Sequence, residues 1–168
     1  MVTSGVAAES WPWVCLLYRV PREPSTPRIA VWRRLRALGV AQLGDGAVAL
    51  PEDPRTREHL EWVADRVLEA DGSALLLRAQ TLTRADEQRL VRGMADARAE
   101  EYRRLTAEVA ELGPVVEDLR VVRRLRRTLR AIQRRDYFPP PERDAAAAAV
   151  RAIAPSPRTD HERAEAAR

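Results

Sequence analysis

The densest group of chemically capable side chains is the segment at residues 120–135, RVVRRLRRTLRAIQRR, which holds eight arginines and no acid. Guanidinium groups fork onto phosphate oxygens and displace counterions, so this composition is typical of contact with nucleic acid. The candidate DNA-binding residues are those expected on the outer side of a helix: Arg120, Arg123, Arg124, Arg127, Arg130 and Arg134. The alternative is a solvated helix face whose charge is neutralised by acids on neighbouring helices.

A second group of arginines surrounds the end of the first predicted strand and the start of the first predicted helix. A helix N-terminus beside cationic side chains suits an oxyanion such as sulfate, phosphate or chromate. The candidate oxyanion-binding residues are Arg19, Arg22, Arg28 and Arg33. The alternative is a charged surface that contributes only to solubility.

Signals for catalysis and for metals are weak. His59 and His161 are not spaced with Cys15 or with any carboxylate set as metal ligands. The phosphate-binding pattern G-x-x-x-x-G-K-[ST], the dinucleotide pattern G-x-G-x-x-G and the nucleophile pattern G-x-S-x-G are absent from the sequence. We therefore expect no catalytic residue, no metal site and no cofactor, and we predict that the protein is not an enzyme.

From the sequence we expect a cytoplasmic protein. A single cysteine, Cys15, cannot form an internal disulfide, which fits a reducing compartment. No apolar run approaches the roughly 20 residues that cross a membrane, and residues 1–10 lack the features of a signal peptide. The net charge is +4, and residues 83–168, with 19 arginines and 15 acids, account for all of it.

The elements that must position these residues begin with an apolar run at 11–20, which is typical of a central strand. A helix follows, with Thr26 predicted as N-cap, Pro27 at its first position and Gly39 just past its end. Its predicted core stripe is Val31, Trp32, Leu35 and Leu38.

Gly44-Asp45-Gly46 then joins two short β-prone pieces, as in a hairpin. Asp53 and Pro54 start a second helix, whose predicted buried face is Leu60, Val63, Ala64, Val67 and Leu68. Residues 73–79 supply one more strand. The order predicts an α+β fold, a ferredoxin-like βαββαβ sandwich over residues 9–82.

The remaining sequence predicts helices. A C-terminal α-helical hairpin is expected over residues 83–136, broken at Gly113-Pro114. The predicted stripe of its second helix is Val115, Leu119, Val122, Leu125, Leu129 and Ile132. A short alanine-rich helix is expected within 137–153, and the polar residues 154–168 are expected to be a disordered tail.

Several blocks of the sequence resemble the N-terminal domain of the chromate-resistance regulator family ChrB. They are the start WVCLLYRVPREPS at 13–25, the basic VWRRL at 31–35 and the hairpin DGAVALP at 45–51. HLEWVADRVLEADGSALLL, ARAEEYRRL and the late RRDYF match further landmarks of that family. The resemblance extends over roughly residues 11–140. The family commonly carries a second, C-terminal domain linked to chromate sensing, which this sequence lacks, so no sensing residue is carried over.

The first half is also distantly similar to the C-terminal domain of phenylacetate-type repressors and to small ferredoxin-like CRISPR-associated nucleases. Those nucleases place a metal-binding aspartate at the end of the first strand. The equivalent stretch here is Tyr18-Arg19-Val20-Pro21. An arginine at the position of that acid argues against a metal-dependent nuclease.

The resemblance implies a non-enzymatic regulatory protein of the chromate-resistance type, which contributes to transcriptional control through DNA contact and dimerisation. The expected partners are DNA, a sensor protein of the ChrB C-terminal type, a chromate or sulfate oxyanion, and a second copy in a homodimer. No membrane partner is expected. The alternative is a protein-interaction module that partners a separately encoded chromate-sensing domain without binding DNA.

Overall fold

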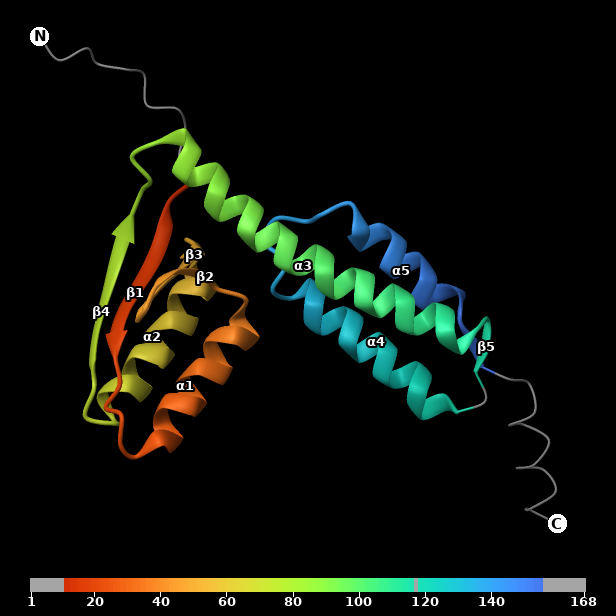
Figure 1. Cartoon of the computed structure of the whole chain (residues 1–168), viewed down its shortest axis with the longest axis horizontal. Coiled ribbons are helices and arrows are strands. Elements are labelled where there is room, and N and C mark those ends of the chain that lie inside the picture. Colours follow the sequence, from red (N-terminus) through yellow and green to blue (C-terminus); the bar gives the residue numbers. More distant parts are fainter. Residues whose placement is uncertain (1–10, 117, 156–168) are drawn as a thin grey trace, which may run out of the picture. The chain divides into compact units, whose positions relative to one another are not determined.

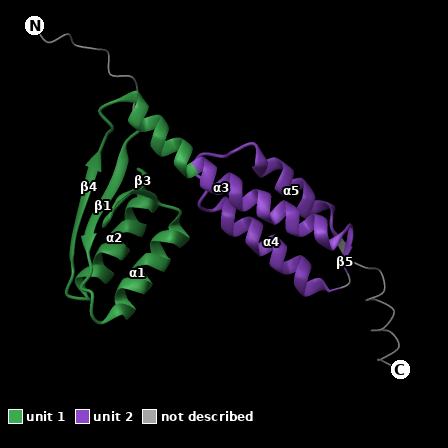
Figure 2. Cartoon of the chain, viewed as in Figure 1, with its two compact units in different colours: residues 1–94 green, residues 95–168 purple. Residues whose placement is uncertain are grey.

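The computed structural model describes residues 11–116 and 118–155. The chain divides into two compact units, residues 1–94 and 95–168, and the long helix α3 (Arg84–Leu112) contributes to both (Figure 2). Within the described ranges, no helix combines the length and the apolar character that a membrane crossing requires.

The first unit is a four-stranded antiparallel sheet with two helices on one of its faces (Figure 1). In chain order its elements are β1 (Trp13–Arg19), α1 (Ser25–Leu38), β2 (Ala41–Gly44), β3 (Ala47–Pro51), α2 (Pro54–Leu68) and β4 (Ser73–Ala79). The strands lie in the order β2-β3-β1-β4. The prediction of a mixed fold of helices and strands, with β1 inside the sheet, is therefore confirmed.

The face of the sheet that α1 and α2 cover holds the core of the first unit. Val14 pairs with Leu50 and Leu16 with Val48, and all four side chains are at most 4% exposed. The helices contribute Val31, Leu35, Leu38, Leu60, Val63 and Val67 to this core, all buried. Because successive residues of a strand point to opposite faces, the other side of β1 carries Leu17.

The opposite face of the sheet leaves leucines exposed. Leu17 pairs with Leu75 on β4, and Leu77 lies two residues further along the same face. Leu17, Leu75 and Leu77 are 41%, 55% and 42% exposed, respectively. A central strand with apolar residues on both faces is expected to be buried on both; this is correct for Trp13–Leu16 and wrong for Leu17.

Helix α1 begins two residues before the predicted start. Ser25 is its first residue, Pro24 takes the cap position with no side-chain hydrogen bond, and Thr26 is therefore not the N-cap. The predicted end is correct, since Gly39 adopts the left-handed conformation, φ 70°, that glycine tolerates. Trp32 is 52% exposed, so its predicted place in the core stripe is wrong.

Helix α2 begins as predicted. Asp53 Oδ1 accepts a hydrogen bond from Thr56 N at 2.8 Å, and Asp53 N donates to Thr56 Oγ1 at 2.9 Å, which completes a capping box ahead of Pro54. Its buried face also follows the prediction except at Leu68, which is 53% exposed.

The turn between β2 and β3 is held against the end of β1. Tyr18 N donates to Gly46 O at 2.7 Å, and Gly46 has φ +70°. A Cβ atom on Gly46 would lie 2.3 Å from Tyr18 O, so both the backbone conformation and the close approach require glycine.

A buried carboxylate ties the start of α3 to the sheet. Glu87 Oε2 accepts from Trp13 Nε1 at 3.1 Å and from Thr81 Oγ1 at 2.7 Å, while Glu87 Oε1 accepts from Trp11 N at 3.1 Å. Burying a carboxylate is costly unless its oxygens are hydrogen-bonded, and both oxygens of Glu87 are.

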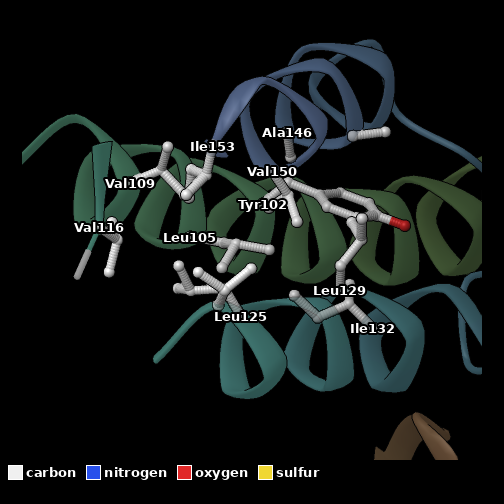
Figure 3. Packing of buried hydrophobic residues seen from close by; sticks show 12 residues of the cluster. Tyr102, Leu105, Val109, Val116, Leu125, Leu129, Ile132, Ala146, Val150 and Ile153 are labelled. Carbon is white, nitrogen blue, oxygen red and sulfur yellow. The ribbon is translucent and has the colours of Figure 1, made fainter. Parts of the chain in front are cut away.

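In the second unit, α4 and α5 pack against the C-terminal part of α3. After α3 come β5 (Val115–Val116), α4 (Leu119–Gln133), α5 (Glu142–Ala152) and β6 (Ala154–Pro155). Figure 3 shows Tyr102 and Leu105 of α3 between Leu125 and Leu129 of α4 and Val150 of α5.

The loop between α3 and α4 differs from the prediction. Val115 belongs to β5, which pairs in parallel with β6, and α4 begins only at Leu119 because Asp118 caps it. Val115 is 54% exposed and does not belong to the buried stripe. The predicted disordered tail starts inside β6, and its residues 156–168 lie outside the described residues.

Candidate nucleic-acid interface

Helix α4 has one buried side and one charged side. Its start is fixed by Asp118, whose Oδ1 accepts a hydrogen bond from Arg120 N at 2.7 Å. Four members of its predicted apolar stripe, Val122, Leu125, Leu129 and Ile132, are at most 9% exposed, whereas Leu119, also predicted in the stripe, is only partly buried. At about 100° per residue, the side of the helix opposite this stripe must carry arginines.

The arginines opposite the stripe form what we term the outer arginine row. It consists of Arg120, Arg123, Arg127, Arg130 and Arg134, all exposed. Their spacing of three and four residues keeps them on one side of α4 over about 21 Å of helix. None of them forms an ion pair with another residue in the ranges 11–116 and 118–155.

The arginines at the edges of this row behave differently. Arg124 Nη2 lies 2.5 Å from Glu108 Oε1 of α3, so this predicted DNA-binding residue faces an acid. Arg126, on the other flank, was not predicted, yet it lines a shallow hollow of about 540 Å³ together with Arg120, Arg123, Arg127 and Arg130. The helical period places both residues on the edges of the buried stripe, and only the position of α3 decides which edge is neutralised.

A buried polar cluster fixes the C-terminal end of α4 against α3. Arg98 Nε lies 3.2 Å from Glu101 Oε2, and Arg135 Nη2 lies 2.8 Å from the same oxygen. Tyr102 Oη donates a hydrogen bond to Asp136 Oδ2 at 2.8 Å. Sequence reasoning predicted no ion pair or hydrogen bond among these residues, although all of them lie in ARAEEYRRL and RRDYF, two landmarks of the resemblance.

Burial shifts the ionisation of two groups in this cluster. It raises the pKa of the Tyr102 hydroxyl far above its ordinary value, and the hydrogen bond to Asp136 adds to the rise. Burial also lowers the pKa of Arg98, although the carboxylate of Glu101 opposes this. The cluster joins the C-terminal end of α4 to α3, on the side of the helix away from the outer arginine row.

The predicted oxyanion-binding residues come from three consecutive segments of the first unit. Arg19 ends β1, Arg22 lies in the following loop, and Arg28 and Arg33 lie on α1, all exposed. Arg28 and Arg33 are five residues apart, which places them about 140° apart around the helix. Oxyanion binding stays a prediction.

The remaining candidate residues occupy separate places. Cys15 is buried in β1, and this burial raises the pKa of its thiol. His59 lies on α2. In the described part of the chain, no three histidine, cysteine, aspartate or glutamate side chains lie close enough together to hold a metal ion.

Comparison with known proteins agrees with the sequence resemblance. The family model for the N-terminal part of Protein ChrB matches residues 28–163. Protein ChrB of Cupriavidus metallidurans is 34% identical over 135 residues, which cover 76% of this chain and 40% of that protein. No solved structure matches. The matched segment includes α4 and the buried polar cluster. The chain belongs to the ChrB family, and the part of ChrB that it matches is the N-terminal part.

Proposed function

We propose that the protein contributes to transcriptional control of chromate resistance by contacting DNA through the outer arginine row. The family relationship supports the chromate-resistance context. One observation carries the DNA contact: five exposed arginines on one side of α4 have no acidic partner among the described residues. Each guanidinium can fork onto a phosphate, and a row of about 21 Å reaches several phosphates of one duplex.

The salt dependence of binding tests this proposal. Fluorescence anisotropy would measure the affinity for a labelled duplex of about 25 base pairs at several salt concentrations, where each phosphate contact contributes a log–log slope of about −0.9. The triple variant Arg123→Gln, Arg127→Gln, Arg130→Gln should flatten the slope by up to about 2.7. Glutamine keeps the helix propensity, so the fold is expected to remain.

A matched control removes three exposed arginines from the start of α3: Arg84→Gln, Arg89→Gln and Arg92→Gln. It changes the net charge equally and should leave most of the slope in place. If the α4 variant retains the wild-type slope, or if the wild type shows no salt-sensitive binding, the DNA proposal fails.

We further propose a homodimer that forms through the open face of the sheet, defined by Leu17, Leu75 and Leu77. Adjacent exposed leucines on a sheet face lose contact with water when a second surface covers them, which is the driving force of most association. The same leucines favour the second candidate function, in which a separately encoded chromate-sensing protein takes that face and no DNA is bound. Light scattering of the pure protein separates the homodimer from the partner-bound alternative, because only the homodimer proposal predicts a dimer in the absence of another protein.

The finer fold assignment and the absence of catalysis are also proposals. The chain order β1, α1, β2, β3, α2, β4, with strands in the order β2-β3-β1-β4, supports a ferredoxin-like classification. Arg19 at the end of β1 supports a non-enzymatic protein, since a cation there disfavours a metal ion. Incubation of pure protein with DNA or RNA and Mg²⁺ or Mn²⁺ tests it. Cleavage that a chelator abolishes would refute it.

A further inference from the structure

A groove runs between α1 and α2 in the first unit, and neither the DNA proposal nor the dimer proposal uses it. Its volume is about 640 Å³, which lies within the range of ligand-binding clefts. It is lined by Thr26, Pro27, Ala30, Val31 and Arg34 of α1 and by Trp62, Val63, Arg66, Glu69 and Ala70 at α2 and the turn after it.

The floor of the groove is apolar and contains a large aromatic anchor. Ala30, Val31, Val63 and Ala70 supply small apolar surfaces. Trp62 is 61% exposed and lines the same hollow. Exposed tryptophans beside small apolar side chains are typical of the centre of a binding interface, where the indole supplies much of the binding energy.

The two edges of the groove differ in charge. Helix α1 contains four arginines and no acid, and none of these arginines forms an ion pair within the described ranges. Of these four arginines, Arg34 lines the groove. On the α2 edge, Arg66 Nη1 lies 2.9 Å from Glu69 Oε2, so that edge is neutral.

This combination favours a peptide over a nucleic acid. Apolar surface on the floor fits aliphatic side chains, whereas the neutral Arg66–Glu69 pair on the α2 edge attracts phosphate little. The chain's own C-terminal segment does not supply the complementary charge, because residues 156–168 hold three arginines and three acids. Acidic side chains of a partner protein would complement Arg34, which forms no ion pair within the described residues.

We propose that this groove binds an amphipathic helix of a partner protein, with aliphatic side chains on the floor against Trp62 and with an acidic side chain at Arg34 on the α1 edge. A helix lying in a groove between two helices is a common mode of peptide recognition. This site is independent of the outer arginine row, so either proposal can fail without the other.

The test uses the full chain and a synthetic peptide of about 15 residues, long enough for four helical turns. Leucines at positions i, i+3 and i+7 form one face of the peptide, and glutamates flank that face on one side. Anisotropy of the labelled peptide should show saturable binding that weakens in high salt. Arg34→Glu and Trp62→Ala should each weaken binding at least about tenfold.

The control variant is Arg92→Glu, which makes the same charge change on an exposed residue of α3 and should bind the peptide as the wild type does. Thermal melting of each variant verifies that it is folded. A lysine-for-glutamate version of the peptide should not bind. Three results would each overturn the proposal. They are no binding of the acidic peptide, binding by Arg34→Glu that equals that of the wild type, and displacement of the peptide from this groove by duplex DNA.

Discussion

Tyr102 donates a hydrogen bond of 2.8 Å to the carboxylate of Asp136, and this bond joins two segments that are 34 residues apart in the chain. Tyr102 is fully buried in the middle of α3, and Asp136 follows the end of α4. The other carboxylate oxygen, Asp136 Oδ1, is buried and has no hydrogen-bond partner among the described residues. The hydroxyl of Tyr102 is thus the hydrogen-bond donor that the structure gives to the Asp136 carboxylate.

The first prediction concerns this bond. Tyr102→Phe keeps the buried ring but leaves the Asp136 carboxylate without a described hydrogen-bond donor, which should lower the free energy of unfolding by about 1–3 kcal/mol. All four tryptophans lie in the first unit, so their fluorescence reports on that unit alone. The urea transition followed by far-UV circular dichroism should therefore shift more than the transition followed by tryptophan fluorescence.

The control for this prediction is the double variant Tyr102→Phe, Asp136→Asn. Neutralising the carboxylate reduces the cost of leaving it unpaired, so the double variant should be more stable than the sum of the single changes implies. Simple additivity would mean that the two groups do not interact in solution.

The second prediction concerns alkaline pH. Burial raises the pKa of Tyr102, so the folded protein keeps this proton above about pH 10, where an unfolded tyrosine loses it. The unfolded state then binds fewer protons than the folded state, and stability falls as pH rises above about 10. Tyr102→Phe should reduce this fall.

Tyr18→Phe is the comparison variant for the alkaline experiment, because burial also raises the pKa of Tyr18, in the first unit. The urea midpoint would be measured at several values between about pH 9 and about pH 11. An equal loss of stability in wild type and Tyr102→Phe would show that Tyr102 does not remain protonated in the folded protein.

Local signals predicted the first unit well because they act over a few residues. The Asp53 cap, Pro54 and Gly39 mark helix ends through backbone geometry that tertiary contacts did not change. The errors have a different origin. Periodicity places Trp32 and Leu68 beside a core stripe, but the width of the covered face depends on where the neighbouring element packs.

The candidate site was predictable as a helix with an arginine side, but its edges were not. The sequence does not reveal that α3 lies beside Arg124 and away from Arg126, because this depends on the rotation of one helix against another. The polar cluster was likewise hidden, since Tyr102 and Asp136 meet only after α3 and α4 pack.

The third prediction concerns the open face of the sheet. Leu75→Asp places a charge among Leu17, Leu75 and Leu77 and should convert a homodimer into monomers without unfolding the first unit. Leu82→Asp is the matched control, because Leu82 is 99% exposed and follows the last strand of the sheet. Sedimentation at micromolar concentrations would give both masses. A wild-type monomer, or a dimer in the Leu75→Asp variant, would contradict dimerisation through this face.

The last prediction uses the ion pair between Arg124 and Glu108 to test which arginines meet phosphate. Glu108→Gln removes the acid that neutralises Arg124, so DNA affinity at low salt should rise and the log–log slope should steepen by up to about 0.9. Glu111→Gln makes the same charge change about one helical turn away, where no arginine partner is described, and should leave the slope near its wild-type value. In the wild-type background, Arg127→Gln should flatten the slope more than Arg124→Gln. Arg124 must break its ion pair with Glu108 before it contacts phosphate, whereas Arg127 forms no ion pair within the described residues. If Glu111→Gln steepens the slope as much as Glu108→Gln, the effect is one of net charge, and Arg124 is not released toward DNA.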